Sequence, residues 1–236
     1  HLLILNSDID DPSFSRGVID FIKVCNVVKT FKNTRILQIG PRPFDFWSVI
    51  VNEGELLEKF GIELSPIPLG ELTSYMNDLI KKDDPRIEET KDVYRKWADI
   101  QIEDRDFTKV AALKLAMQDK MKEYGCNCGT IQCWTELQRE IGILPYASEA
   151  LLQTEGMPVT CETDINGTIS EVLAEAATLG EERALFADVN CRHPENENGE
   201  LLQHLGTFAF QTAKNRPVLP PSHFVFDYPG SAAFQV

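Results

Sequence analysis

Short apolar segments alternate with helix-patterned segments along most of this 236-residue sequence. The segment 35–40 has the composition of a buried strand and ends at the turn Pro41-Arg42-Pro43. Further along, the apolar segments 157–162 and 184–189 flank a helix-patterned segment at 168–179. Strands that alternate with helices are typical of a parallel sheet, because each connection must cross over the sheet. We therefore predict an α/β fold: a doubly wound, mainly parallel sheet flanked by helices.

Other helices are predicted where apolar side chains recur at i, i+3, i+4 and i+7, or where a segment ends at a glycine. The apolar positions are Val18, Phe21, Ile22, Cys25 and Val28 in 14–31, Val93, Trp97 and Ile100 in 87–102, and Val110, Met117 and Met121 in 107–124. Shorter helices are predicted at 53–60, 136–141 and 147–155, and extended segments at 62–69 and 128–134.

The pattern changes after Asp188, where helical spacing gives way to short extended segments and a proline-rich turn. The extended segments are 201–210, 218–219 and 224–226. Both ends of the sequence are apolar, which suggests a piece of a longer protein. We expect three parts: 1–32 as a linker or helix from an N-terminal domain, 33–180 as a central α/β domain, and 181–236 as the truncated start of a β-rich C-terminal domain.

The charge balance limits the classes of ligand. Lys and Arg number 23 against 37 Asp and Glu, so the formal net charge is −14. Such a charge is a poor match for nucleic acid or an anionic membrane. No run approaches the ~18 apolar residues of a spanning helix, and the apolar start lacks the basic region of a signal peptide. We expect a cytoplasmic protein whose ligand is neutral or metal-assisted.

Six cysteines occur, but nothing else indicates a disulfide framework in a chain this long. Buried, reduced thiols in a reducing compartment are the expectation. A zinc site on Cys126, Cys128 and Cys133 is an alternative, although the paired C-x-x-C spacing of structural zinc sites is absent.

Two carboxylates and an imidazole carry the candidate chemistry. Glu162 ends one predicted strand and Asp188 ends the next. Ligands bind outside the carboxyl ends of strands in open α/β sheets, so neighbouring strands would bring both carboxylates to one edge. His204 follows in an apolar run, where a lone histidine is unexpected. This set suits a divalent metal such as Mn²⁺, with Glu162, Asp188 and His204 as ligands.

Structural interpretations compete with this site. An acidic residue after a strand is often a helix N-cap, which suits Asp164 or Asn166 better than metal ligation. A lone histidine such as His204 is more often a hydrogen-bonded core residue than a ligand.

Three motifs resemble the L-fucose isomerase and L-arabinose isomerase superfamily. Cys161-Glu162-Thr163-Asp164-Ile165-Asn166-Gly167 resembles its Glu-x-Asp motif. Leu185-Phe186-Ala187-Asp188-Val189 is similar to its second acidic motif, and Leu201-Leu202-Gln203-His204-Leu205-Gly206 to a metal-binding histidine segment of the arabinose type. The region from Gln132 to the end carries this resemblance. The turn Gly40-Pro41-Arg42-Pro43 and the segment Glu55–Leu69 also resemble the start of the central domain in fucose-isomerase-related proteins.

The resemblance implies a Mn²⁺-dependent aldose–ketose isomerase that works through an ene-diol, with no nucleotide cofactor. Glu162 and Asp188 would be the catalytic base and acid, and the substrate a pentose or deoxyhexose such as L-arabinose or L-fucose. It also implies a homo-oligomer, trimeric or hexameric, as the full-length protein, and little activity in a central-domain fragment. A non-catalytic sugar-binding or regulatory module that keeps the isomerase fold is the rival hypothesis, since one fold hosts many functions.

Overall fold

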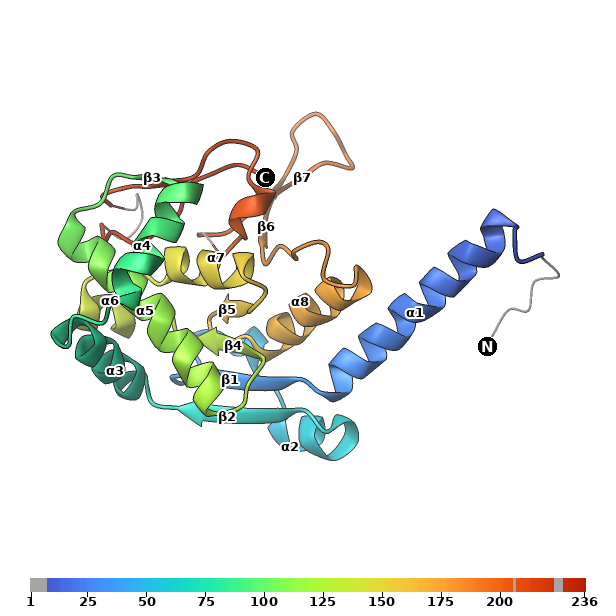
Figure 1. The fold of residues 1–236 in the computed structure, drawn as a ribbon, viewed down its shortest axis with the longest axis horizontal. Coiled ribbons are helices and arrows are strands. Elements are labelled where there is room, and N and C mark those ends of the chain that lie inside the picture. Colours follow the sequence, from blue (N-terminus) through green and yellow to red (C-terminus); the bar gives the residue numbers. More distant parts are fainter. Residues whose placement is uncertain (1–7, 206, 223–226) are drawn as a thin grey trace.

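The computed structural model describes residues 8–205, 207–222 and 227–236. Four strands form one sheet in the order β2-β1-β4-β5, and every pairing in it is parallel (Figure 1). These strands are β1 (Arg35–Ile39), β2 (Glu63–Ile67), β4 (Cys128–Ile131) and β5 (Val159–Cys161). The predicted α/β class with a mainly parallel sheet is therefore confirmed. The first seven residues and the extended segment predicted at 224–226 lie outside the described residues.

The helices are α1 (Pro12–Lys32), α2 (Glu53–Glu55) with a π-helical turn (Leu56–Phe60), α3 (Leu69–Lys81), α4 (Arg86–Trp97), α5 (Asp104–Glu123), α6 (Glu136–Ile141), α7 (Tyr146–Thr154) and α8 (Ile165–Ala177). Two single 3-10 turns lie at Trp47–Val49 and Phe210–Thr212. Within the described residues, no helix combines the length and apolar character needed to cross a bilayer.

Apolar cores lie on both faces of the sheet. Ile36 and Leu37 are neighbours in β1 and point to opposite faces, because side chains alternate along a strand. Leu37 belongs to the larger core, which includes buried residues of α3, α4, α5 and α7. Ile36 belongs to a smaller core that includes Ile62 and the buried face of α8. Helices thus cover both faces, as expected of a doubly wound sheet.

Helix α1 projects away from the body of the molecule (Figure 1). It begins after Asp11, whose side chain accepts a hydrogen bond from the backbone N–H of Ser13. Near its C-terminal end, the Asn26 amide donates to the carbonyl of Ala176 in α8 at 2.8 Å. The predicted helix is confirmed, but none of its residues is buried, and Phe21 is 52% exposed. Its apolar spacing predicted the helix without predicting its burial.

The C-terminal segment packs against the α/β body. Strand β8 (Val218–Leu219) pairs in parallel with β3 (Asp99–Ile100), and Phe210 and Leu219 belong to the larger core. The Phe210 ring centroid lies 6.1 Å from that of Tyr94 in α4. The domain boundaries after residues 32 and 180 stay predictions.

Two sequence expectations need correction near α3 and α4. The sequence patterns did not indicate α3, although Leu69, Leu72, Met76 and Leu79 are buried at helical spacing. The helix predicted at 87–102 ends at Trp97, because the backbone is extended at Ala98 and Asp99 then pairs with β8. Trp97, one of the apolar positions from which that helix was predicted, is 36% exposed.

Candidate functional site

Glu162 directly follows β5, at the carboxyl edge of the sheet, as predicted. The next residue, Thr163, donates its backbone N–H to the carbonyl of Ile131 at the end of β4, across 3.2 Å. Glu162 and Thr163 have φ values of +67° and +50°, the left-handed region that costs a residue with a side chain roughly 1–2 kcal/mol. Two such residues in succession identify this turn as a candidate functional position.

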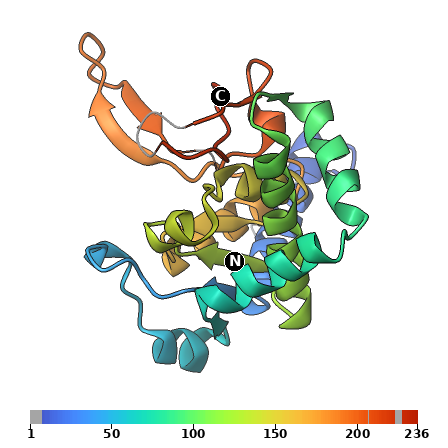
Figure 2. The same ribbon diagram turned by 90° about the vertical axis from the view of Figure 1, so that its left-hand side faces the viewer.

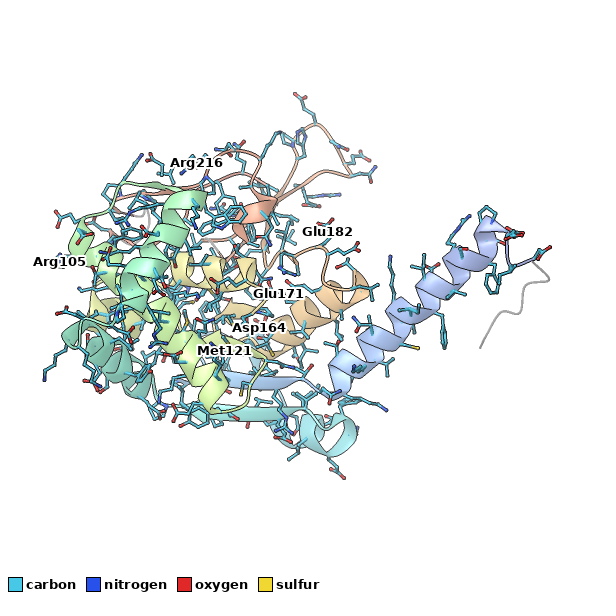
Figure 3. All side chains as sticks on the ribbon, viewed as in Figure 1. Arg105, Met121, Asp164, Glu171, Glu182 and Arg216 are labelled. Atoms are coloured by element: carbon cyan, nitrogen blue, oxygen red, sulfur yellow. The ribbon has the colours of Figure 1, made fainter. Side chains whose placement is uncertain are left out.

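Asp164 begins α8 as its N-cap. Its carboxylate accepts a hydrogen bond from the backbone N–H of Gly167 at 2.9 Å, and Figure 3 shows it at the start of the helix. The interpretation of Asp164 as a cap is confirmed, and Asn166 lies exposed in the first turn of α8. The cap fixes the turn that carries Glu162.

Asp188 lies in a different strand arrangement from the predicted one. The segment 184–187 is not a strand of the parallel sheet. Instead, Asp188 opens β6 (Asp188–Arg192), which pairs in antiparallel fashion with β7 (Glu200–Gln203). Asp188 lies opposite Gln203, so the residue after Gln203, His204, is its close neighbour. The prediction of two neighbouring parallel strands was wrong, because an apolar run does not reveal which strand it pairs with.

His204 is largely enclosed by aromatic rings. Its ring centroid lies 5.2 Å from Phe186 and 6.4 Å from Tyr146, the latter at an interplanar angle of 90°. Its Nδ1 atom is buried and has no hydrogen-bond partner among the described residues. Burial lowers the pKa of His204, and the negative charge of Asp188 partly opposes that shift. The imidazole is therefore biased toward the neutral form that binds metals or accepts protons.

Glu162 is electrostatically linked to Asp188. Burial is the main cause that raises its pKa to about 7, and the negative charges of Asp188 and Asp164 raise it further. A carboxyl group with such a pKa populates both protonation states near neutral pH, as a general acid–base catalyst must. The structure thus brings Glu162, Asp188 and His204 into one neighbourhood.

Sequence reasoning missed a buried polar group behind Glu162. Glu149 in α7 is fully buried, and its Oε2 accepts a hydrogen bond from the Cys161 thiol at 3.0 Å. Burial raises the pKa of Glu149 to about 8. Glu149 Oε1 and the Tyr146 hydroxyl have no hydrogen-bond partner among the described residues. The available signal was an acidic residue close to the apolar run Ala150-Leu151-Leu152 in the helix predicted at 147–155.

The cysteines do not support a zinc site. Cys128 and Cys133 belong to different apolar clusters, and Cys126 is half-buried. All six thiols are free, and Cys25 and Cys191 are exposed rather than buried as expected.

A divalent cation fits the donor chemistry of Glu162, Asp188 and His204, because the set has two carboxylates and an imidazole with an unpartnered buried nitrogen. As the described side chains lie, no group of three His, Cys, Asp or Glu is close enough to hold an ion.

Comparison with known proteins points to sugar isomerases. No family model matches the chain. It is similar to proteins named sulfoquinovose isomerase from Alkalicoccus urumqiensis, Priestia aryabhattai and Priestia megaterium, each 22% identical over 205 residues. These matches cover 87% of the chain for the first and 86% for the other two. The chain spans 45% of the length of each relative. Together with the sequence motifs, these names are consistent with a sugar isomerase superfamily.

Proposed function

We propose that this chain is part of an aldose–ketose isomerase that acts on a sugar. The observation that carries the proposal is the raised pKa of Glu162 at the carboxyl edge of a parallel sheet, to which the negative charge of Asp188 contributes. His204 follows Gln203, the residue that pairs with Asp188. The names of the similar proteins support the same class of reaction.

The proposed chemistry is a proton transfer between C1 and C2 of an open-chain sugar. Glu162 removes the C2 proton of the aldose and returns it to C1. Asp188 takes the proton of the C2 hydroxyl and delivers it to the C1 oxygen. The partial burial of Glu162 weakens the competition from water for that proton. A bound Mn²⁺, held by Glu162, Asp188 and His204, would supply Lewis acidity toward the C1 and C2 oxygens.

The proposal also concerns which sugar is the substrate. The motifs resemble enzymes of pentoses and deoxyhexoses, which suggests L-arabinose or L-fucose. The similar proteins are named for sulfoquinovose, a hexose with a sulfonate on C6. A cytoplasmic homo-oligomer that includes this central α/β domain completes the proposal.

The test is conversion of these aldoses by the full-length polypeptide with added Mn²⁺, followed by NMR of proton exchange at C2. We expect Glu162→Gln to lower kcat by about 10²–10⁴-fold, because the variant cannot accept the proton. Glu182→Gln is the matched control, since Glu182 is exposed and lies beyond α8 (Figure 3). Turnover that survives Glu162→Gln would contradict the mechanism.

One observation favours the rival, a non-catalytic sugar-binding module: the described candidate ligands do not form a three-ligand group. Calorimetry with the same sugars, with and without Mn²⁺, separates the two. Sugar binding that needs no metal and leads to no proton exchange would support the module.

A further inference from the structure

Arg42 lies in the loop that follows β1 and is held in a fixed position there. Its Nη1 donates to the backbone carbonyls of Pro43, Phe44 and Phe46 at 2.9, 3.1 and 3.1 Å. The centre of its guanidinium lies 5.0 Å from the centroid of the Trp47 ring, within range of a cation–π contact. Nε and Nη2 make no hydrogen bond, and no carboxylate pairs with Arg42, among the described residues. One edge of the guanidinium is therefore organised but available to a ligand.

This loop shares an edge of the sheet with Glu162. Strands β1, β4 and β5 run parallel, so this loop and Glu162 both follow the carboxyl ends of their strands. In Figure 2 the blue loop after β1 lies low on the left, and the orange β6–β7 hairpin lies high on the left. The Phe46 and Trp134 ring centroids lie 6.0 Å apart, which connects the loop to the segment after β4.

The spacing of the strands sets the distance that a ligand must bridge. Strand β4 lies between β1 and β5, and neighbouring strands are ~4.8 Å apart, so the two strand ends lie about 10 Å apart. An open six-carbon sugar with an acidic group at its far end extends roughly 8 Å, from bonds of ~1.5 Å. The length of such a sugar is therefore of the same order as the separation of the two strand ends.

Charge makes Arg42 the natural partner for an acid. The chain carries a net charge of −14, which repels anions, so an acidic ligand needs a local cation. Arg42 is the single cationic residue in the segments that directly follow the four strands, 40–46, 68, 132–135 and 162–164. A free guanidinium edge matches the paired oxygens of a sulfonate or a phosphate.

We propose that Arg42 binds the anionic group of an acidic sugar, a sulfonate or phosphate remote from C1, whose other end lies at Glu162. The inference rests on the proposed function and narrows its substrate class from neutral pentoses and deoxyhexoses to acidic hexoses. It also departs from the expectation, drawn from net charge alone, of a neutral or metal-assisted ligand.

The test is calorimetric binding of sulfoquinovose, glucose 6-phosphate and glucose to the full-length polypeptide. We expect at least one acidic sugar to bind more tightly than glucose. Comparison of sulfoquinovose with glucose 6-phosphate shows whether the sulfonate or the phosphate is preferred. Arg42→Gln should weaken that binding by 10- to 100-fold and leave glucose unchanged. Arg42→Lys, which keeps the charge without the two-pronged geometry, should fall between. Arg139→Gln, which removes an exposed cation of α6, is the control for net charge.

Three results would overturn the inference: glucose binding as tightly as both acidic sugars, Arg42→Gln weakening all three ligands equally, or Arg42→Gln weakening none. Absence of any binding overturns it as well. Proton exchange at C2, measured on the same samples, reports separately on the proposed function. Acidic-sugar binding that depends on Arg42 without exchange would contradict the isomerase and leave the binding site intact.

Discussion

The Cys161 thiol donates a hydrogen bond to Glu149 Oε2 across 3.0 Å, one residue before Glu162 in the chain. This contact ties α7 to the end of β5 and places a buried acid behind the candidate site. Glu149 keeps its proton in the folded state because burial disfavours its charged form. A protonated, buried carboxyl group makes the stability of this region depend on pH.

Replacing Glu149 with Gln should flatten the dependence of stability on pH. The pKa of Glu149 is about 8 in the folded state against an ordinary value of 4.5, so between these values the folded state holds an extra proton. The free energy of unfolding of the wild type should therefore fall as pH rises, by up to ~1.4 kcal/mol per pH unit from this group. Urea unfolding at pH 5, 6, 7 and 8 measures the slope. The control variant Glu89→Gln, at an exposed position, should keep the wild-type slope. An unchanged slope in Glu149→Gln would refute the raised pKa of Glu149.

Gln153 supports two further buried carboxyl groups. Its Nε2 donates to Glu171 Oε1 at 2.9 Å and to Glu175 Oε1 at 2.8 Å, joining α7 to α8. We expect Gln153→Ala to lower the free energy of unfolding by roughly 2–4 kcal/mol, because both carboxyl groups lose a buried donor. The exposed Gln101→Ala should change it little. A loss below about 1 kcal/mol at Gln153, also measured by urea unfolding, would argue against this network.

Phe210→Ala tests whether the C-terminal segment and the α/β body unfold together. The Phe210 ring packs against Tyr94, Trp97 and Phe234, at centroid distances of 6.1, 6.4 and 6.0 Å. Loss of the ring should cost about 3–5 kcal/mol and shift one cooperative transition in calorimetry. Leu201→Ala on the exposed face of β7 is the control. Two separate transitions, with the larger one unmoved, would instead support a domain boundary near residue 180.

Gly40→Ala should disturb the loop that carries Arg42. Gly40 has a φ of +81°, and a Cβ there would lie 2.8 Å from Gln132 Oε1 and 2.9 Å from its Cβ. Gly61, with a φ of +72° and open space around it, is the matched control. Both Ala variants carry the left-handed strain, of roughly 1–2 kcal/mol, but Gly40→Ala adds a steric term of roughly 1–3 kcal/mol. Equal losses in thermal unfolding would show that Gln132 moves aside freely.

Local patterns predicted the elements that depend on neighbours in sequence. The helices at 107–124 and 136–141 are confirmed, and their buried side chains recur at helical spacing, as Val110, Met117 and Met121 do at i, i+7 and i+11. The position of Glu162 after β5 and the cap at Asp164 also follow from short-range features. Each of these two features depends on residues only a few positions away in the sequence.

Other features depend on contacts between residues far apart in sequence. The apolar spacing of α1 predicted its helix, yet whether Phe21 is buried depends on what packs there. The acid behind the site, Glu149, was hidden in an apolar helix pattern because only the packing of α7 on β5 shows its burial.

The amino-acid sequence by itself determined the α/β class, the parallel sheet and the placing of Glu162 at a strand end, because hydrophobic periodicity and strand–helix alternation are local. Only the tertiary structure decided how Asp188 and His204 approach Glu162. Strand pairing is made by hydrogen bonds to a partner elsewhere in the chain, and here that partner is β7 in an antiparallel hairpin rather than β5 in the sheet.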